Sequence, residues 1–168
     1  VASSPPSDPS DTPSDPSDIP SQIMSLKTLG NEAFTSADYP LSITHYTSAL
    51  SLVASSSLTL SPLYAPIYAN RSAAYLATKK WVKASWDAQC AAKADPNYWK
   101  AHWRHGLALM SMAPRIERSQ TAVDAFRRAR ELCPEGKRGE VDEMVARAET
   151  RLREGKDRVP MPPQCQQS

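Results

Sequence analysis

The stretch "ASWDAQCAAKADP", residues 84–96, sets the pattern of this 168-residue chain. In this stretch a small residue, a filling residue, a second small residue and a residue at the helix end stand at positions 1, 5, 8 and 13. Two further stretches have the same spacing, "AVDAFRRARELCP" at 122–134 and "SITHYTSALSLVA" at 42–54. Small residues at the first and third positions let two helices approach closely, the residue between them fills the adjoining gap, and proline ends the helix. Three related helices are therefore predicted, with Ala88 an undersized filler in the middle one and Ala54 in place of the proline in the first.

Composition predicts that the rest of the central part is helical too. Ala, Leu, Lys, Arg and Glu dominate it, the whole chain has only 5 glycines, and no alternation of Val, Ile and Thr indicates a strand. Five breaker segments divide it, at 36–40, 54–62, 94–96, 112–115 and 133–136. They delimit six helices and a seventh at 137–155, so the predicted fold class is all-α.

Four residues mark where individual helices are expected to begin. Pro40 and Pro62 suit a first helical turn, because proline lacks the N–H that an interior helical residue donates. Ser61 is expected to cap the helix that follows it, and Ser119 to begin the sixth helix.

The two ends of the chain differ from the helical part. Residues 1–20 are almost entirely Ser, Pro and Asp and have too little apolar surface to offset the entropy of ordering, so a disordered arm is expected. Residues 157–168 contain prolines and no periodic pattern, so they are expected to be a tail or linker. The whole chain has a net charge of +2, the four aspartates of the arm contribute −4 to it, and residues 21–168 therefore carry +6, which favours an acidic partner.

Several classes of protein are disfavoured by what the sequence lacks. It has no run of about 18 apolar residues that could span a bilayer, and its N-terminus lacks the layout of a secretory signal. The three cysteines, Cys90, Cys133 and Cys165, are odd in number and have no CxxC spacing, so neither a disulfide framework nor a zinc site is predicted. A soluble chain in a reducing compartment is expected.

No catalytic or metal centre is predicted either. The sequence has no Ser-His-Asp order, glycine-rich phosphate loop or pair of apposed carboxylates, so neither enzymatic activity nor a cofactor is expected. His102 and His105 lie three residues apart, but together with the distant Cys90 they do not make a complete ligand set for a metal.

Aromatic and basic residues raise the alternative of nucleic-acid binding. Four tryptophans interleaved with cations could stack on bases, namely Trp81, Trp86, Trp99 and Trp103. Tryptophan is commonly mostly buried, so roles in the core or in a groove wall are favoured. The run "RRAR" at 127–130 lies on a helix whose other positions pack, so it is expected to be a solvated face, and no nucleic-acid partner is predicted.

The repeated spacing resembles that of the tetratricopeptide repeat family, over roughly residues 21–156. The resemblance implies helix-turn-helix units of about 34 residues, stacked into a right-handed superhelix with a concave peptide groove that is lined by the first helix of each unit. Three units and a C-terminal capping helix are expected, at about 22–54, 62–96, 97–134 and 137–155.

Two intervals depart from the family period. Ser42 and Ala84 are 42 residues apart, and Ala84 and Ala122 are 38 apart. The first excess is assigned to the breaker at 54–62 and the second to residues 110–120, because insertions at turns cost little.

Five polar residues on the first helices of the units match a binding pattern of the family. The two-carboxylate clamp of co-chaperone tetratricopeptide domains has Lys-x-x-x-Asn in the first unit, Asn in the second and Lys-x-x-x-Arg in the third. The matching residues are Lys27, Asn31, Asn70, Lys100 and Arg104. Ala73, one turn after Asn70, would leave room for a peptide side chain beside them.

The resemblance implies that this clamp holds the free C-terminus of cytosolic heat-shock chaperones of the seventy- and ninety-kilodalton classes, which end in Glu-Glu-Val-Asp. The chemistry agrees, because a terminal aspartate presents two carboxylates, and cations and amide donors form strong charge-assisted hydrogen bonds with them. A cytoplasmic adaptor that acts as a co-chaperone is the favoured function.

Two other functions stay open at this point. The domain could be the chaperone-targeting half of an enzyme, since similar clamps are joined to ubiquitin ligase, prolyl isomerase and phosphatase domains. It could also be a general scaffold that binds an internal peptide or nucleic acid, and a requirement for a free terminal carboxylate would separate that scaffold from the other two. Arg104 resembles the chaperone-organising and small glutamine-rich co-chaperones more than the ubiquitin-ligase clamp. The sequence leaves open the preferred chaperone class and the oligomeric state.

Overall fold

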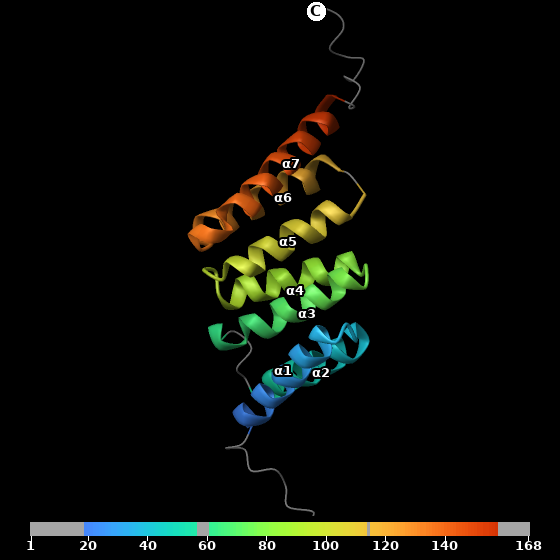
Figure 1. Ribbon diagram of the computed structural model, residues 1–168, viewed down its shortest axis with the longest axis vertical. Coiled ribbons are helices and arrows are strands. Elements are labelled where there is room, and N and C mark those ends of the chain that lie inside the picture. The colour runs from blue at the N-terminus through green and yellow to red at the C-terminus, as the bar shows by residue number, and fades with distance from the viewer. Residues whose placement is uncertain (1–18, 57–60, 114, 158–168) are drawn as a thin grey trace, which may run out of the picture.

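The protein is an elongated stack of helices in a computed structural model that describes residues 19–56, 61–113 and 115–157 (Figure 1). The helices are α1 (Ile19–Thr35), α2 (Tyr39–Ser55), α3 (Ala65–Ala77), α4 (Trp81–Ala94), α5 (Trp99–Ser111), α6 (Ile116–Leu132) and α7 (Arg138–Asp157). Two short 3-10 turns, η2 (Pro62–Tyr64) and η3 (Glu135–Lys137), precede α3 and α7. The all-α prediction is confirmed, since these described ranges contain seven helices and no strand.

The ends of the helical part differ slightly from the predicted boundaries. Helix α1 begins at Ile19, within the predicted arm 1–20, and α7 ends at Asp157, the first residue of the predicted tail. The other predictions for the arm and the tail concern residues 1–18 and 158–168, which lie outside the described residues.

Consecutive helices form hairpins that stack along the long axis of the molecule. Helices α1 and α2, α3 and α4, and α5 and α6 make the three pairs, and α7 packs on α6 at the far end (Figure 1). Contacts between pairs join α2 to α3 and α4 to α5, and α3 also touches α1 and α5. None of the described helices combines the length and the hydropathy needed to cross a membrane.

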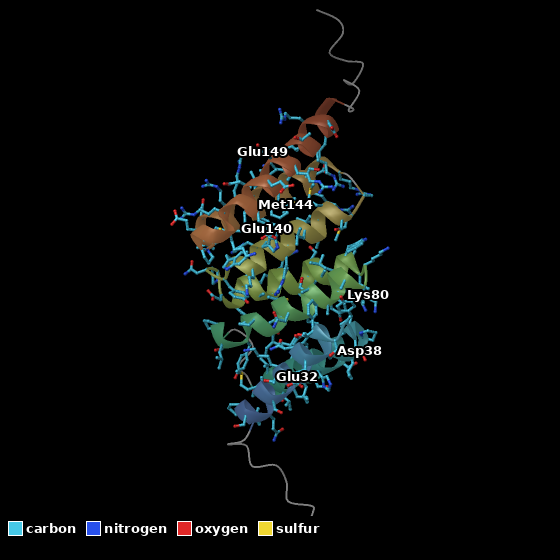
Figure 2. The ribbon with its side chains drawn as sticks, viewed as in Figure 1. Glu32, Asp38, Lys80, Glu140, Met144 and Glu149 are labelled. Carbon is cyan, nitrogen blue, oxygen red and sulfur yellow. The ribbon has the colours of Figure 1, made fainter. Side chains whose placement is uncertain are left out.

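The first two hairpins turn in the same way. Ala37 and Lys79, which precede the starts of α2 and α4 by two residues, have positive φ angles of 60° and 57°. The next residues, Asp38 and Lys80, lie on the same side of the stack (Figure 2). Asp38 caps α2, because its carboxylate accepts a 3.0 Å hydrogen bond from the Leu41 backbone N–H. The equal turns are independent support for a structural repeat.

Two of the predicted helix starts are wrong. Ser61 precedes Pro62, but the proline begins the 3-10 turn η2 and not α3, and the Ser61 side chain makes no capping hydrogen bond. Ser119 does not begin the sixth helix, because α6 starts three residues earlier, at Ile116, and Ser119 is buried in its first turn. Pro40 lies in the first turn of α2 as predicted.

The extra turn of α6 explains the longer interval between the second and third units. Ala122 is the seventh residue of α6, whereas Ala84 is the fourth of α4 and Ser42 the fourth of α2. Three of the four excess residues between Ala84 and Ala122 therefore lie at the start of α6, which is close to one turn of about 3.6 residues, and the fourth lies in the connection at 112–115, one residue longer than that at 78–80. The excess in the first interval includes residues 57–60, which lie outside the described residues.

The repeated spacing of small and larger residues corresponds to a packed pair of residues in each unit. In the first unit the ring of Tyr46 lies so close to Gly30 that a Cβ added to residue 30 would be 2.5 Å from the ring. In the third unit a Cβ added to Gly106 would be 2.6 Å from the ring of Phe126. The middle unit has Ser72 at the glycine position and Ala88 at the aromatic one, and both are fully buried. The small filler Ala88 is therefore matched by a larger residue on the facing helix.

Helix α7 covers the end of the stack with an apolar row. Its members pack against buried residues of α5 and α6, and they are Val141, Met144, Val145, Ala148 and Leu152. Met144 is labelled on α7 in Figure 2, between Glu140 and Glu149. The expected capping helix is therefore present, and it protects an apolar surface of the third unit from water.

The tryptophans do not all have the expected place. Trp81, Trp99 and Trp103 are half-buried, and the Trp103 ring meets Phe126 edge to face at a centroid distance of 5.4 Å. Trp86 is 67% exposed, so the prediction of a core or groove-wall role is wrong for it. The reason is its position two residues from both Ala84 and Ala88, which places it on the opposite side of α4 from these buried residues.

Candidate functional site

The first helices of the three units contribute to one small cavity of about 190 Å³. Four of the six predicted site residues line it, namely Asn31 of α1, Asn70 and Ala73 of α3, and Arg104 of α5. These residues are up to 73 positions apart in the sequence, and the stacking of α1, α3 and α5 brings them together. The rest of the lining is Phe34, Thr35 and Tyr46.

A chain of hydrogen bonds fixes the polar groups of this cavity. The Tyr46 hydroxyl donates to Asn31 Oδ1 over 2.7 Å, and Asn70 Nδ2 donates to the same oxygen over 2.9 Å. Arg104 Nη1 in turn donates to Asn70 Oδ1 over 3.2 Å. Both amide oxygens are therefore satisfied within the protein, and within the described residues the Asn31 Nδ2 group donates to no protein acceptor. That amide nitrogen remains available as a donor to a ligand or to water.

The Arg104 guanidinium is partly removed from water without an acid beside it. Burial lowers its pKa below the usual value, and the nearby Tyr98 and Tyr46 oppose that shift. No carboxylate occurs among the residues that line the cavity, and Arg104 forms no salt bridge within the described part of the chain. A desolvated cation gains more from an anionic ligand than a hydrated one does, so the cavity is suited to a carboxylate.

The two predicted lysines lie outside the cavity lining. Lys27 is half-buried on α1, one turn before Asn31, and Lys100 is exposed on α5, one turn before Arg104. The Lys100 ammonium lies 6.0 Å from the centre of the Trp99 ring, and among the described residues neither lysine forms a salt bridge. Residues four apart on a helix share a face, so Lys27 lies on the face of α1 that carries Asn31, and Lys100 lies on the face of α5 that carries Arg104.

Three lining residues were not predicted from the sequence as part of the site. Phe34 and Thr35 end α1 beside the amides, and Tyr46 reaches the cavity from α2 with its hydroxyl. A signal for Tyr46 was present, because its position in the repeat carries Phe126 in the third unit and Ala88 in the second. A hydroxyl group at a buried packing position indicates a polar partner, and here the partner is Asn31.

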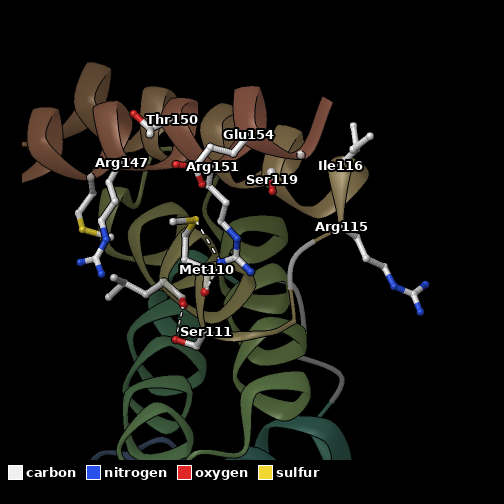
Figure 3. A pocket seen from close by; sticks show the side chains of 12 residues that line it. Met110, Ser111, Arg115, Ile116, Ser119, Arg147, Thr150, Arg151 and Glu154 are labelled. Atoms are coloured by element: carbon white, nitrogen blue, oxygen red, sulfur yellow. Dashed lines mark hydrogen bonds between the residues drawn. The ribbon is translucent and has the colours of Figure 1, made fainter. Parts of the chain in front are cut away.

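A larger pocket of about 1020 Å³ lies further along the stack, between α5, α6 and α7 (Figure 3). Leu107 and Ser111, which follow Arg104 on the same face of α5, are part of its lining. Arg151 of α7 lies among its lining residues and donates to the backbone oxygens of Met110 and Met112, the latter over 2.6 Å, whereas the Arg115 side chain points away from the pocket. Helix α5 thus contributes lining residues to both cavities.

His105 and the arginine run at 127–130 lie outside the cavity lining. His105 is half-buried, and burial together with the nearby His102 lowers its pKa to about 4. Within the described ranges no group of three His, Cys, Asp or Glu side chains could hold a metal ion. Within the run at 127–130 the three arginines are exposed and pair with acids, and Ala129 is buried, so the prediction of a solvated face is confirmed.

Known proteins with similar sequence or structure are tetratricopeptide repeat (TPR) proteins, although no family model matches the chain. The heat-shock protein cognate (HSC) co-chaperone sgt12 of Aspergillus fumigatus is 42% identical over 89 residues, which are 52% of this chain and 24% of that protein. The crystal structure of the Sgt2 TPR domain from Aspergillus fumigatus is 28% identical, with a TM-score of 0.66 and coverage of 83% of this chain and 85% of that one. The second TPR domain of human RPAP3, in complex with the HSP70 peptide SGPTIEEVD, is 26% identical, with a TM-score of 0.63 and coverage of 78% and 98%.

These likenesses and the three stacked hairpins show that the described part of the chain has the fold of a tetratricopeptide repeat domain. It is similar to the TPR domains of Sgt2 and RPAP3 and to the co-chaperone sgt12, and the predicted resemblance to tetratricopeptide repeat domains is confirmed. The chain spans about a quarter of the length of the curated relatives it matches.

Proposed function

We propose that this domain is a peptide-binding adaptor that clamps the C-terminal Glu-Glu-Val-Asp carboxylates of cytosolic heat-shock chaperones, of the 70 and/or 90 kDa classes, and so acts as a co-chaperone in the cytoplasm. The observation that carries the proposal is the desolvated Arg104 guanidinium, set beside two amides in a cavity whose lining contains no acid. The RPAP3 and Sgt2 likenesses support the choice of partner, because the RPAP3 domain is bound to a peptide that ends in EEVD.

The proposed roles follow from the position of each group. Arg104 and the free Asn31 Nδ2 group donate to a carboxylate of the terminal aspartate inside the cavity, while Asn70 holds both of them in place. Lys27 and Lys100 neutralise the second carboxylate from the edge, where their side chains can move toward the peptide. Ala73 leaves space for the neighbouring peptide side chain, because its own side chain is only a methyl group.

A titration with short peptides tests the function. Peptides that end in EEVD, with the upstream sequences SRM or SGPTI, are expected to bind with a Kd on the order of micromolar, about −8 kcal/mol, because a flexible peptide loses entropy when it is ordered. Higher salt should weaken binding. The same peptides with an amidated C-terminus are the matched control, and equal affinity of the free and amidated forms would overturn the proposal.

The same titration separates the alternatives. A scaffold for internal peptides would bind both forms equally, whereas a clamp requires the free carboxylate. A clamp that targets an enzyme would behave as a co-chaperone clamp does in this assay, and the name of the curated relative sgt12 favours the co-chaperone. No catalytic role is proposed for the residues of this chain.

A further inference from the structure

Tyr46 makes two different contacts with α1 across the first hairpin. Its ring fills the space left by Gly30, and its hydroxyl donates to Asn31 Oδ1 over 2.7 Å. The residue is 1% exposed, so the ring belongs to the core while the hydroxyl reaches the lining of the small cavity.

The third unit shows that packing does not need the hydroxyl. Phe126 occupies the same place in its unit and lies as close to Gly106 as Tyr46 lies to Gly30. Phe126 has no polar atom, and the unit is packed with a fully buried phenyl ring. A Phe at residue 46 would therefore fill the space beside Gly30 equally well. The hydroxyl is not needed for packing, so its effect must be sought in its hydrogen bond to Asn31.

That hydrogen bond affects the direction of the Asn31 amide. An asparagine amide can turn by 180°, which exchanges its donor and acceptor ends at little cost unless the neighbours prefer one of them. Here Oδ1 accepts hydrogen bonds from both Tyr46 and Asn70, and Asn70 is itself oriented by the donor Arg104. In the turned state Asn31 Nδ2 would face the Asn70 Nδ2 donor, and Oδ1 would face the anion that the cavity is suited to.

We propose that the Tyr46 hydroxyl is a positioning group for the clamp, which holds the Asn31 amide in the direction set by Asn70, so that Nδ2 is presented to the terminal carboxylate of the peptide. The inference rests on the proposed function for its ligand and on the hydrogen bonds of the first hairpin for its mechanism. Tyr46 acts through Asn31 and does not have to touch the peptide.

The variant Tyr46→Phe tests this role because it removes only the hydroxyl. The Kd for a free EEVD peptide should rise about three- to tenfold, the value of one hydrogen bond, and the weak binding of the amidated peptide should not change. Tyr64→Phe is the matched control, since Tyr64 is buried in the same apolar cluster and its hydroxyl makes no hydrogen bond within the described residues. Its ratio of affinities for free and amidated peptide should equal that of the parent.

A double-mutant cycle distinguishes positioning from a general loss of structure. In the Asn31→Ala background, Tyr46→Phe should have no further effect on the Kd, because the group that it positions is absent. The inference would be overturned if Tyr46→Phe lowered the affinity for the free peptide equally in the parent and in the Asn31→Ala background. It would also be overturned if a folded Tyr46→Phe protein bound the peptide as the parent does.

The Asn31 side-chain amide also gives a measurement that does not depend on the peptide. In NMR spectra of the free protein, Tyr46→Phe should shift and broaden the Asn31 Nδ2 signals, while Tyr64→Phe leaves them unchanged. If the parent does not discriminate between free and amidated peptides, the proposed function fails, and these signals still decide whether Tyr46 fixes the amide. Unchanged Asn31 signals in Tyr46→Phe would overturn the positioning role.

Discussion

Arg71 of α3 holds Asp87 of α4 through two hydrogen bonds, from Nε to Oδ2 over 2.7 Å and from Nη2 to Oδ1 over 2.8 Å. A third guanidinium nitrogen donates to the Thr47 hydroxyl of α2 over 3.1 Å, so one side chain joins three helices and two units. The Asp87 side chain is 3% exposed, and burial raises the pKa of its carboxyl although Arg71 opposes the shift.

Asp87→Ala should lower the free energy of unfolding by about 3 to 5 kcal/mol, because it leaves the half-buried Arg71 cation without its partner. Glu131→Ala is the control, since it breaks an ion pair whose two side chains are 44% and 63% exposed, and it should cost less than about 1 kcal/mol. Urea denaturation measures both. Equal losses in the two variants would mean that the Arg71–Asp87 pair has no special structural role.

Gly106→Ala should destabilise the third unit by about 1 to 3 kcal/mol, because the new Cβ would lie 2.6 Å from the Phe126 ring and force it to move. Gly139→Ala makes the same chemical change in α7, where nothing lies within 4 Å, and should leave stability unchanged or raise it by up to about 1 kcal/mol. Thermal melts compare the two. A neutral Gly106→Ala would show that the close approach is not required.

The middle unit suggests a sharper version of this test. Gly106→Ser combined with Phe126→Ala copies the Ser72 and Ala88 pair into the third unit. The double variant should be less destabilised than the sum of its single changes, since the new side chain occupies part of the space that the ring leaves. If the losses of unfolding free energy in the two single variants simply added up in the double variant, as measured by urea denaturation, the two positions would not compensate for each other in filling the hairpin.

Arg104→Met should weaken the binding of a free EEVD peptide by about 1.5 to 3 kcal/mol. It should not lower the free energy of unfolding and should raise it by up to about 1 kcal/mol, because the native protein no longer desolvates an unpaired cation. Lys100→Met is the comparison, since Lys100 is exposed: binding should fall while stability stays within about 0.5 kcal/mol. Calorimetric titration and chemical denaturation of each variant give the two quantities. A large loss of stability in Arg104→Met would assign this residue to the scaffold.

Stability should fall as the pH is lowered from about 6.5 to about 4, partly because of His105. Its pKa is lowered from 6.5 to about 4 in the folded protein, so over this range the unfolded chain binds a proton that the folded protein does not. The contribution lost by pH 4 is at most about 3 kcal/mol. His105→Gln should reduce the slope of unfolding free energy against pH within this window, and an unchanged slope would show that His105 titrates normally.

The helices and their pairing could be predicted from the sequence because they depend on periodic small residues and on breakers, which are local signals. Asn31, Asn70 and Arg104 could be predicted as site residues because their spacing along each first helix matches a family pattern, and the structure places all three in the lining of one cavity. The sequence could predict that Lys27 and Lys100 lie on the same helix faces as Asn31 and Arg104, but not that they lie outside the cavity lining. The position of a residue on a helix does not determine how far its flexible side chain reaches.

The features that sequence reasoning missed depend on contacts between distant helices. The burial of Arg104 beside Tyr46 and Tyr98 brings together α5, α2 and the residue before α5, and the periodicity of one helix carries no information about that environment. A core or groove-wall role was predicted for Trp86 because of its residue type, although its position relative to the small residues of α4 already placed it on the opposite side. Position in the repeat was the better guide.

The linear arrangement of the hairpins also affects which part of the protein can separate from the rest by partial unfolding. Among the described helices, the main contacts join elements of the same or of adjoining units, so the first hairpin can separate from the others without unfolding them. Such an opening removes Asn31 from Asn70 and Arg104 and dismantles the cavity while most of the native structure persists. Backbone amides of α1 and α2 should therefore exchange with solvent hydrogen faster than those of α4 and α5. A bound carboxylate terminus, held by three units at once, should slow exchange most in α1 and α2, far beyond the residues that it touches.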